Sequence, residues 1–505
     1  MDKSVEILRT GDFWIDLGIS YVWQYLISRG SNIKVNQEEN KTTVEILNEK
    51  NNLEVIAIQT PPKISMEYSE DIILKQELVD MLETIKPHYL GISKKGKEKW
   101  DRQGLFFSAI TVRTSFFEPP RLDDHHKRSA DSCAFCGSEK FALKQTGATN
   151  QPLMANPGKF SSFYSNLRGD VKICEMCIFV SKFSPSRIFY RISKGLFTAI
   201  AFESNDLIGL NSIFKEFSEI SVQSIGYRNF RSELEFTMYP LETFFDFLFS
   251  VVQSVERKKD LESKNLIMRE LITRVHIIQG TVGRTLSLDK YYVIPNMPRV
   301  LDFISKCRWS SKKQKTYNSM LETARWLVIK RERETETTVR EEFARRMIYN
   351  ADVTDLIERF LISRAEDESL NQFVRINLDK FIRMYSLNQL RLDYNQLRLT
   401  ERIGNTIGSL AAGEEKSLLY DLRSIANLDR LIEFFHRLLV RYSEEISQLD
   451  RDESAINKDF KDLLDELENR NWRTYKSLIG IYSALKFSEL TNPQPKNQTT
   501  PEIKA

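Results

Sequence analysis

Two pairs of cysteines are the residues of this sequence whose type and spacing most clearly support chemistry. The pairs lie in the segments CAFC and CEMC, and their members are Cys133, Cys136, Cys174 and Cys177. Four thiolates suit a tetrahedral Zn²⁺, which binds sulfur at about 2.3 Å. The two-residue gap within each pair lets both sulfurs reach one ion. Because all four ligands come from the protein, the predicted zinc site is closed, and so structural rather than catalytic.

The distance between the two pairs leaves other interpretations open. There are 37 residues between Cys136 and Cys174, more than the roughly 15–20 that are usual for this arrangement. We therefore expect the intervening loop to project from the site. Gly137, directly after the first pair, suits a tight turn beside a metal. An iron–sulfur cluster uses the same four ligands, and four unmetallated thiols are a third possibility.

The fifth cysteine and the N-terminal residues indicate in which cellular compartment the protein is expected. Cys307 lies in a basic stretch, and we interpret it as an incidental free thiol. The first residues lack the apolar segment of a signal peptide, and no run approaches the roughly 18 apolar residues that span a bilayer. We expect a cytoplasmic protein that does not enter the membrane. In such a reducing compartment, paired cysteines favour metal chemistry over disulfides.

Positive charge is concentrated in two stretches, although the whole chain is nearly neutral. The 505 residues include 73 basic and 70 acidic ones, for a net charge of +3. Residues 121–194 contain twelve bases and six acids, and residues 299–331 contain nine bases and two acids around Trp309. Bases beside amides and aromatic rings are typical of nucleic-acid surfaces, although a solvated face has the same composition. The candidate nucleic-acid contacts are Asn156, Lys159, Asn166, Arg168, Arg308, Lys312, Lys313 and Lys315.

Hydrophobic periodicity predicts an α+β fold. The pattern indicates a helix over residues 13–27, a hairpin of strands 42–47 and 53–60, a helix over 69–85, and a strand over 104–116. Strands 187–192 and 196–202 form a second predicted hairpin, and residues 241–255 a buried helix. From there on we expect mainly helices. Residues 299–492 lack proline, which predicts a helical bundle, with a break near Asn427.

These patterns divide the chain into five predicted regions. They are a mixed N-terminal α/β region (1–120), an inserted four-cysteine zinc module (121–182), a β-hairpin followed by a mainly helical basic region (183–340), a C-terminal helical bundle (341–490) and a disordered tail (491–505). The tail contains three prolines among mostly polar residues, a composition that cannot bury a core.

Common catalytic motifs are absent from the sequence. It has no phosphate-binding loop, no serine nucleophile elbow, no HExxH zinc site and no kinase motif. The string Asp123-Asp124-His125-His126 resembles metal-binding composition, but adjacent residues seldom converge on one ion. We therefore expect no enzymatic activity. A zinc-binding nucleic-acid enzyme such as a nuclease, and a scaffolding protein with merely solvated basic patches, stay as alternatives.

Two features together resemble one protein family. The segment TGDFWIDLGI at residues 10–19 is similar to the TG-[DN]-x-[FW]-x-D-x-G-I opening of certain CRISPR-associated proteins. The CAFC and CEMC pairs resemble the CXXC–CXXC domain that names part of the same family. That family supplies the large subunit of type I Cascade complexes, of subtype I-B or the related I-A. The resemblance covers the opening and residues 133–177.

The resemblance implies a non-catalytic subunit at the 5′-handle end of the crRNA. Such a subunit recognises the protospacer-adjacent motif in duplex DNA, supports unwinding and holds the displaced strand, while the guide RNA reads the long target. The implied cofactor is a structural Zn²⁺ on the four cysteines. The implied partners are crRNA, double-stranded target DNA, the backbone, 5′-handle and small subunits of Cascade, and a recruited helicase–nuclease or transposition factor. Met347 or Met384 would suit an internal start for a separate small subunit.

Overall fold

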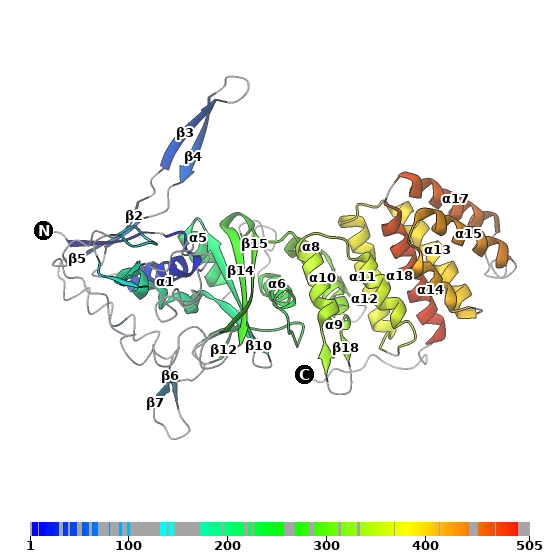
Figure 1. Cartoon of the computed structure of the whole chain (residues 1–505), viewed down its shortest axis with the longest axis horizontal. Coiled ribbons are helices and arrows are strands. Elements are labelled where there is room, and N and C mark those ends of the chain that lie inside the picture. The colour runs from blue at the N-terminus through cyan, green and yellow to red at the C-terminus, as the bar shows by residue number, and fades with distance from the viewer. Residues whose placement is uncertain are drawn as a thin grey trace. The chain divides into compact units, whose positions relative to one another are not determined.

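The computed structural model divides the chain into two compact units, Met1–Pro298 and Arg299–Ala505, both drawn in Figure 1. Each is described by itself below. The structure describes residues 3–8, 10–29, 34–38, 41–47, 53–59, 63–68, 80, 90–92, 98–100, 132–138, 141–145, 172–193, 196–216, 221–224, 227–256, 268–281, 287–311, 315–330, 334–367, 369–413, 415–443, 453–469 and 471–492. Helices and sheets occur together, which confirms the α+β class.

A mixed sheet forms the centre of the first unit. Within the described part of the chain it has six strands in the order β12-β13-β10-β11-β14-β15, and only the β10–β13 pair is parallel. The strands are β10 (Phe189–Ser193), β11 (Leu196–Ser204), β12 (Ser221–Ser224), β13 (Tyr227–Phe230), β14 (Ile272–Thr281) and β15 (Ser287–Pro295). The antiparallel pairing of β10 with β11 confirms the hairpin predicted around residue 194.

The expectation of mainly helical structure after residue 241 is wrong for the end of this unit. The predicted buried helix is present as α6 (Pro240–Glu256), but β14 and β15 follow it and complete the sheet. The sequence of β14, ITRVHIIQGT, is rich in β-branched residues, and Val275 to Gly280 are all buried. A short apolar run of this kind suits a strand covered on both faces better than an amphipathic helix. The first unit ends shortly after β15, at Pro298. This boundary lies inside the single region predicted for residues 183–340.

Helices cover both faces of the sheet, with α1 (Phe13–Arg29) on one side and α6 on the other (Figure 1). Phe202 of β11 contacts Phe247 of α6, with ring centroids 5.8 Å apart. His276 of β14 lies on the opposite face, where Phe13 of α1 stacks on it at 3.8 Å. Successive residues of a strand point to opposite faces, so one sheet supports two packed layers. The helix predicted over residues 13–27 is therefore confirmed.

Buried acids of α6 are satisfied by the segment that precedes the helix. Asp246 accepts hydrogen bonds from the backbone N–H groups of Glu233 and Leu234, at 2.7 and 2.8 Å, and from the Ser232 hydroxyl at 2.7 Å. Burial raises the pKa of Asp246, although these donors and Arg191 favour its charged form. Helix α6 can thus be apolar on most of its surface and still carry a carboxylate.

Smaller elements complete the first unit. They are β1 (Lys3–Leu8), β2 (Lys34–Glu38), β3 (Lys41–Leu47), β4 (Leu53–Gln59), β5 (Lys63–Tyr68), β6 (Leu90–Ile92), β7 (Glu98–Trp100), β8 (Leu143–Gln145), β9 (Lys172–Cys174), α4 (Glu175–Ser181), the 3₁₀ helix η3 (Ser184–Arg187) and α5 (Leu207–Glu216). The antiparallel pairing of β3 with β4 confirms the first predicted hairpin. The predicted helix 69–85, apart from Asp80, and the predicted strand 104–116 lie outside the described residues.

The second unit consists mainly of helices, as predicted for the bundle. They are α8 (Val300–Lys306), α9 (Ser319–Trp326), α10 (Thr338–Ile348), α11 (Thr354–Ser363), α12 (Gln372–Asn388), α13 (Tyr394–Gly413), α14 (Ser417–Ser424), α15 (Leu428–Arg441), α17 (Glu453–Asn469) and α18 (Trp472–Thr491). Asn427 accepts from the Arg430 N–H at 2.9 Å and caps α15, which confirms the predicted break. Of the predicted tail, residues 493–505 lie outside the described residues.

Glycines allow the helices of the second unit to approach closely. A Cβ placed on Gly408 of α13 would lie 2.3 Å from the Ser483 carbonyl oxygen of α18, and one on Gly404 would lie 2.5 Å from Tyr482 Cβ. Any larger residue would push α13 and α18 apart. Gly480 of α18 has the same role towards Glu358 of α11.

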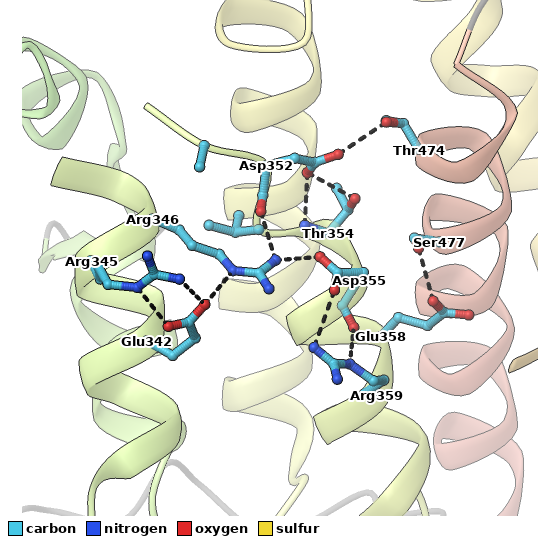
Figure 2. A network of polar contacts seen from close by, with 12 residues as sticks. Glu342, Arg345, Arg346, Asp352, Thr354, Asp355, Glu358, Arg359, Thr474 and Ser477 are labelled. Carbon is cyan, nitrogen blue, oxygen red and sulfur yellow. Dashed lines mark hydrogen bonds and ion pairs between the residues drawn. The ribbon is translucent and has the colours of Figure 1, made fainter. Parts of the chain in front are cut away.

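Charged side chains connect α10, α11 and α18, as Figure 2 shows. Arg346 lies between Glu342, at 2.7 Å, and Asp355. Deeper in the unit, Lys476 of α18 lies 3.0 Å from the carboxylate of Glu358. Burial raises the pKa of Glu358, and Lys476 opposes that rise. None of the described helices combines the length and the apolar composition that a membrane span requires.

Candidate metal centre

The four paired cysteines converge in the first unit. Their sulfur atoms all lie within 4.8 Å of one another. Cys133 Sγ is 3.9 Å from Cys177 Sγ, and Cys136 Sγ is 3.6 Å from Cys174 Sγ. A tetrahedron with metal–sulfur bonds of about 2.3 Å has sulfur–sulfur edges of about 3.8 Å. The prediction that these residues meet is confirmed, and the cluster has the size that one metal ion needs.

A turn at the first pair presents Cys133 and Cys136. The Gly137 N–H donates to the Cys133 carbonyl at 2.9 Å, and the Cys133 N–H donates to the Ser138 carbonyl at 3.0 Å. Gly137 has a φ of +70°, a left-handed backbone conformation that residues other than glycine rarely adopt. The tight turn predicted at this glycine is therefore present, and it places both sulfurs on one side of the backbone.

The second pair is placed by the start of α4. Cys174 ends β9 and is the N-cap of α4, where its sulfur accepts from the Cys177 N–H at 3.4 Å. The Cys174 N–H in turn donates to Cys133 Sγ at 3.3 Å. Backbone N–H groups thus point at two of the sulfurs, which favours their thiolate form. These N–H groups contribute positive potential in addition to that of a bound cation.

Paired strands bring the two cysteine pairs together. β8 pairs antiparallel with β9, so that Leu143 lies opposite Cys174. The Ala134 N–H also donates to the Lys172 carbonyl at 3.0 Å. These contacts hold the segments together although many residues separate them in sequence. The loop residues Asn156, Lys159, Asn166 and Arg168 lie outside the described residues, so their predicted nucleic-acid contacts stay predictions.

The environment of the sulfurs favours a structural site. Cys133, Cys174 and Cys177 are buried, and Cys136 is half-buried. Hydrogen bonds from Cys136, Cys174 and Cys177 lower the pKa of the Cys133 thiol, whereas hydrogen bonding to Cys133 raises the pKa of Cys174. The pKa of the Cys136 thiol is lowered as well and that of Cys177 is raised, so two thiolates form more easily and the other two need a cation beside them. With four protein sulfurs around it, such an ion has no open position for a substrate.

The same distances distinguish one ion from a cluster. In a four-iron cluster each cysteine binds a different iron, which holds the sulfurs farther apart than a shared ion does. Here every pair of sulfurs is within 4.8 Å, so the residues fit a single ion better. Zinc, as predicted, satisfies this geometry and the preference for thiolate ligands.

The opening segment TGDFWIDLGI folds into a cap at the start of α1. Asp16 accepts from the Thr10 N–H at 2.8 Å, from the Thr10 hydroxyl at 2.9 Å and from the Gly11 N–H at 3.1 Å. Asp12 accepts from the Ile15 N–H at 3.0 Å, in the manner of an N-cap residue. Gly11 has a φ of +76°. The conspicuous residues of this segment therefore build a helix start.

Helix α1 rests directly on the helix that carries Cys177. A Cβ on Gly18 would lie 2.0 Å from the Val180 carbonyl oxygen of α4. Ser184 of η3 donates to the Trp14 carbonyl of α1, and Trp14 is fully buried. The opening segment and the cysteine module, far apart in sequence, are thus neighbours in one packed layer. Sequence reasoning missed this contact; Gly18 inside a helical pattern was the available signal.

Several bases counted in the first positive stretch are turned into the protein. Arg187 is buried, with its guanidinium 4.9 Å from the Phe214 ring centroid and hydrogen bonded to Gln24. Arg191 lies 3.4 Å from the buried carboxylate of Asp246. Lys182 is also buried. These three stabilise the fold, so the positive surface near the cysteines is smaller than the sequence count suggested.

The second basic stretch forms a hairpin fixed to a helix. β16 (Arg308–Ser310) pairs with β17 (Thr316–Asn318), and Arg308 and Lys315 are exposed. Trp309 Nε1 donates to Asn377 Oδ1 of α12 at 2.9 Å, and Lys380 Nζ lies 4.6 Å from the Trp309 ring centroid. The aromatic residue thus anchors the hairpin. Lys312 and Lys313 lie outside the described residues.

Cys307, the remaining cysteine, lies in the interior of the second unit. It is buried at the end of α8, and its carbonyl accepts from the Ser319 hydroxyl at 2.9 Å. Burial raises the pKa of its thiol. A buried, protonated thiol is unreactive, in line with the interpretation of Cys307 as an incidental thiol.

Residues 126–188 match a family model described as CRISPR-associated protein (Cas_CXXC_CXXC). The matched segment contains both cysteine pairs, α4 and η3. A search of curated proteins found no match. The match supports a CRISPR-associated protein of the CXXC–CXXC kind, in agreement with the resemblance noted from the sequence.

Proposed function

We propose that this chain is the non-catalytic large subunit of a type I CRISPR surveillance complex, of subtype I-B or I-A. In that role it recognises the protospacer-adjacent motif in duplex DNA and supports crRNA-guided unwinding. The observation that carries the proposal is the convergence of four cysteines within the segment that matches the CRISPR-associated family model. The opening segment packs against this same module through Gly18 and Val180, which supports treating the two motifs as one signature.

The predicted role of the four cysteines is structural. They would hold one Zn²⁺, which supplies a charge that stabilises neighbouring thiolates and fixes the turn at Gly137 against α4. No side chain of the module needs to react. The chain is therefore proposed to bind nucleic acid, and DNA cleavage would belong to a recruited helicase–nuclease. The partners remain those that the resemblance implies: crRNA, target DNA and the other Cascade subunits.

The basic hairpin β16–β17 supports a contact with phosphates. Arg308 and Lys315 are exposed near its two ends, and Trp309 ties its backbone to α12. A hairpin that is held in place loses little conformational entropy when it binds. Phosphate contacts position a protein on DNA without reading its sequence. The hairpin is thus proposed to strengthen binding to any target rather than to select the adjacent motif.

Binding by the assembled complex tests the main proposal. The chain is mixed with guide RNA and backbone subunits, and its affinity is measured for duplex targets that differ only in the flanking motif. We expect one motif to bind best, affinity to fall steeply with salt, and no cleavage with Mg²⁺ or Mn²⁺. Cleavage by the chain alone would favour the nuclease alternative. Absence of DNA binding in the assembled complex would favour the scaffold.

Charge reversal tests the hairpin. Arg308→Glu with Lys315→Glu should weaken binding about tenfold or more to all targets alike, because phosphate contacts are sequence-independent. We expect the same direction from Lys312→Glu with Lys313→Glu. The matched control is Arg430→Glu with Arg437→Glu on α15, where both residues are also exposed. If the hairpin variant keeps its affinity, or if the control loses as much, the hairpin is not a DNA surface.

A further inference from the structure

Three strands of the six-stranded sheet fix the side chain of one exposed tyrosine. The Tyr291 Oη of β15 is 2.7 Å from His276 Nδ1 of β14, and His276 Nε2 is 3.0 Å from Glu203 Oε2 of β11. His276 is buried, and the Phe13 ring stacks on it at 3.8 Å with an interplanar angle of 13°. The hydroxyl end of the tyrosine is therefore held by a histidine that is itself oriented by Glu203 and covered by Phe13.

Tyr291 is also partly exposed. Its side chain is 48% exposed, and Val293, two residues along the same strand and so on the same face, is 42% exposed. Within the described part of the chain, β15 is an outer strand of the sheet. The Arg274 guanidinium lies 3.4 Å from Glu203, and its side chain is 58% exposed. A flat ring, an aliphatic side chain and a guanidinium thus share this face of the sheet, with Arg274 opposite Pro295, four residues along β15 from Tyr291.

We propose that Tyr291 is a stacking site for an unpaired base of a single-stranded nucleic acid, with Val293 beside the base and Arg274 near a phosphate. The inference rests on the proposed function and names the form of nucleic acid that this face binds. An aromatic ring on a sheet stacks with any base because every base has a π-face. Bases of an intact duplex are stacked on each other, so only a separated strand offers a free face.

The hydrogen bonds around His276 explain why such a site would be efficient. A side chain that is already fixed pays less conformational entropy when a ligand orders it. Glu203 orients His276, His276 orients Tyr291, and Phe13 of the opening segment covers the histidine. The guanidinium of Arg274 can keep its contact with Glu203 and still attract a phosphate, because it has more than one N–H donor.

Anisotropy of labelled oligonucleotides tests the site in the full chain. Oligothymidylate and oligouridylate of about 20 nucleotides, and a duplex of the same length, are titrated with wild-type protein and variants. Tyr291→Ala should weaken binding of the single strands about tenfold, the scale of a lost base stack, and leave the duplex unchanged. Tyr291→Phe keeps the ring, so its affinity for the single strands should fall much less. The control is Tyr349→Ala, a tyrosine of the second unit with 49% exposure.

Photocross-linking gives a readout that does not depend on a variant folding. Wild-type protein is irradiated with a single strand that contains 5-bromouracil, and the attached peptide is identified by mass spectrometry. The adduct should be at Tyr291. Whether DNA or RNA gives the stronger signal tells which strand this face binds.

The outcomes separate this inference from the proposed function. If wild-type protein binds duplex DNA but Tyr291→Ala keeps full single-strand affinity, or if cross-links form elsewhere, the stacking site is wrong and the proposed function stands. If Tyr291→Phe loses as much as Tyr291→Ala, the hydroxyl rather than the ring is what matters, and stacking is wrong. If the wild-type chain binds neither form, alone or in its complex, both proposals fail.

Discussion

The cysteine module and the second unit differ in the source of the positive charge that lies beside their buried acidic groups. In the module, Cys133, Cys174 and Cys177 bring thiols together, and the described hydrogen bonds of their sulfurs come from backbone N–H groups and other cysteines. In the second unit, buried Glu358 has Lys476 at 3.0 Å and the Ser477 hydroxyl at 2.8 Å. One region must obtain its positive charge from solution, and the other carries it in its own sequence. The module should therefore respond to chelators and acid, and the second unit to substitution of single charges.

The largest expected effect comes from removing ligands of the module. Cys174→Ser with Cys177→Ser should abolish stoichiometric metal and destabilise the first unit by several kcal/mol, because binding of a structural ion contributes about 10 kcal/mol or more to such folds. Metal analysis and calorimetry measure both. The second unit's transition should not move. Cys307→Ala, which also removes a buried thiol, should leave the metal content intact. Full metal content in the double variant would refute the assignment of these ligands.

Breaking the buried pair should have the next largest effect, confined to the second unit. Glu358→Gln leaves the Lys476 ammonium, only 8% exposed, without its carboxylate, at a cost of about 3 kcal/mol. Urea unfolding measures the loss. Glu358→Leu with Lys476→Met should be less destabilised than the single variant, because no buried charge is left uncompensated. A double variant with a lower free energy of unfolding than Glu358→Gln would contradict this account.

Substitution of one glycine in each region allows the close helix contacts of the two regions to be compared. Gly18→Ala places a methyl group 2.0 Å from the Val180 carbonyl oxygen, and Gly408→Ala places one 2.3 Å from the Ser483 carbonyl oxygen. Each should cost about 2 kcal/mol from overpacking. Only Gly18→Ala should speed metal transfer to a chelator, because Gly18 lies against α4, the helix that carries Cys177. Equal transfer rates in the two variants would mean that α1 does not brace the module.

The smallest effect concerns pH. The hydrogen bond from Arg345, and that from Arg346, hold the pKa of Glu342 at about 2, below the ordinary value of 4.5. The folded state therefore keeps Glu342 ionised where the unfolded chain binds a proton. Its contribution to stability is complete above pH 4.5 and is lost as pH falls towards 2. Glu342→Gln should flatten that part of the second unit's pH profile by less than about 1 kcal/mol, since the pair is partly exposed. An unchanged slope would show that the pair contributes nothing.

Local patterns in the sequence predicted much of the fold. The helix at residues 13–29, the hairpins β3–β4 and β10–β11, the buried helix α6 and the cap at Asn427 each depend on neighbouring residues alone. The error came at β14, whose burial depends on pairing with β11, a strand some 70 residues earlier in the chain, and at β15, which pairs with β14. Apolar runs of that length suit a buried strand or a buried helix, and only pairing decides.

The candidate site shows the same division. The convergence of Cys133, Cys136, Cys174 and Cys177 was predicted correctly, because a metal site imposes residue type and spacing on the sequence. The charge count around them was a poorer guide, since Lys182, Arg187 and Arg191 contribute to the interior and not to a surface. Net charge over a segment says nothing about which side of the backbone each base lies on.

The sequence alone identified the four cysteines of the candidate metal centre and several of the local elements, because both follow from side-chain chemistry over a few residues. Only the tertiary structure showed that Gly18 gives α1 its contact with α4, and that His276, Glu203 and Tyr291 come together from three strands. Those contacts join residues that lie far apart in the chain; Glu203 and His276, for example, are 73 positions apart. They arise from packing and strand register, which no single segment specifies.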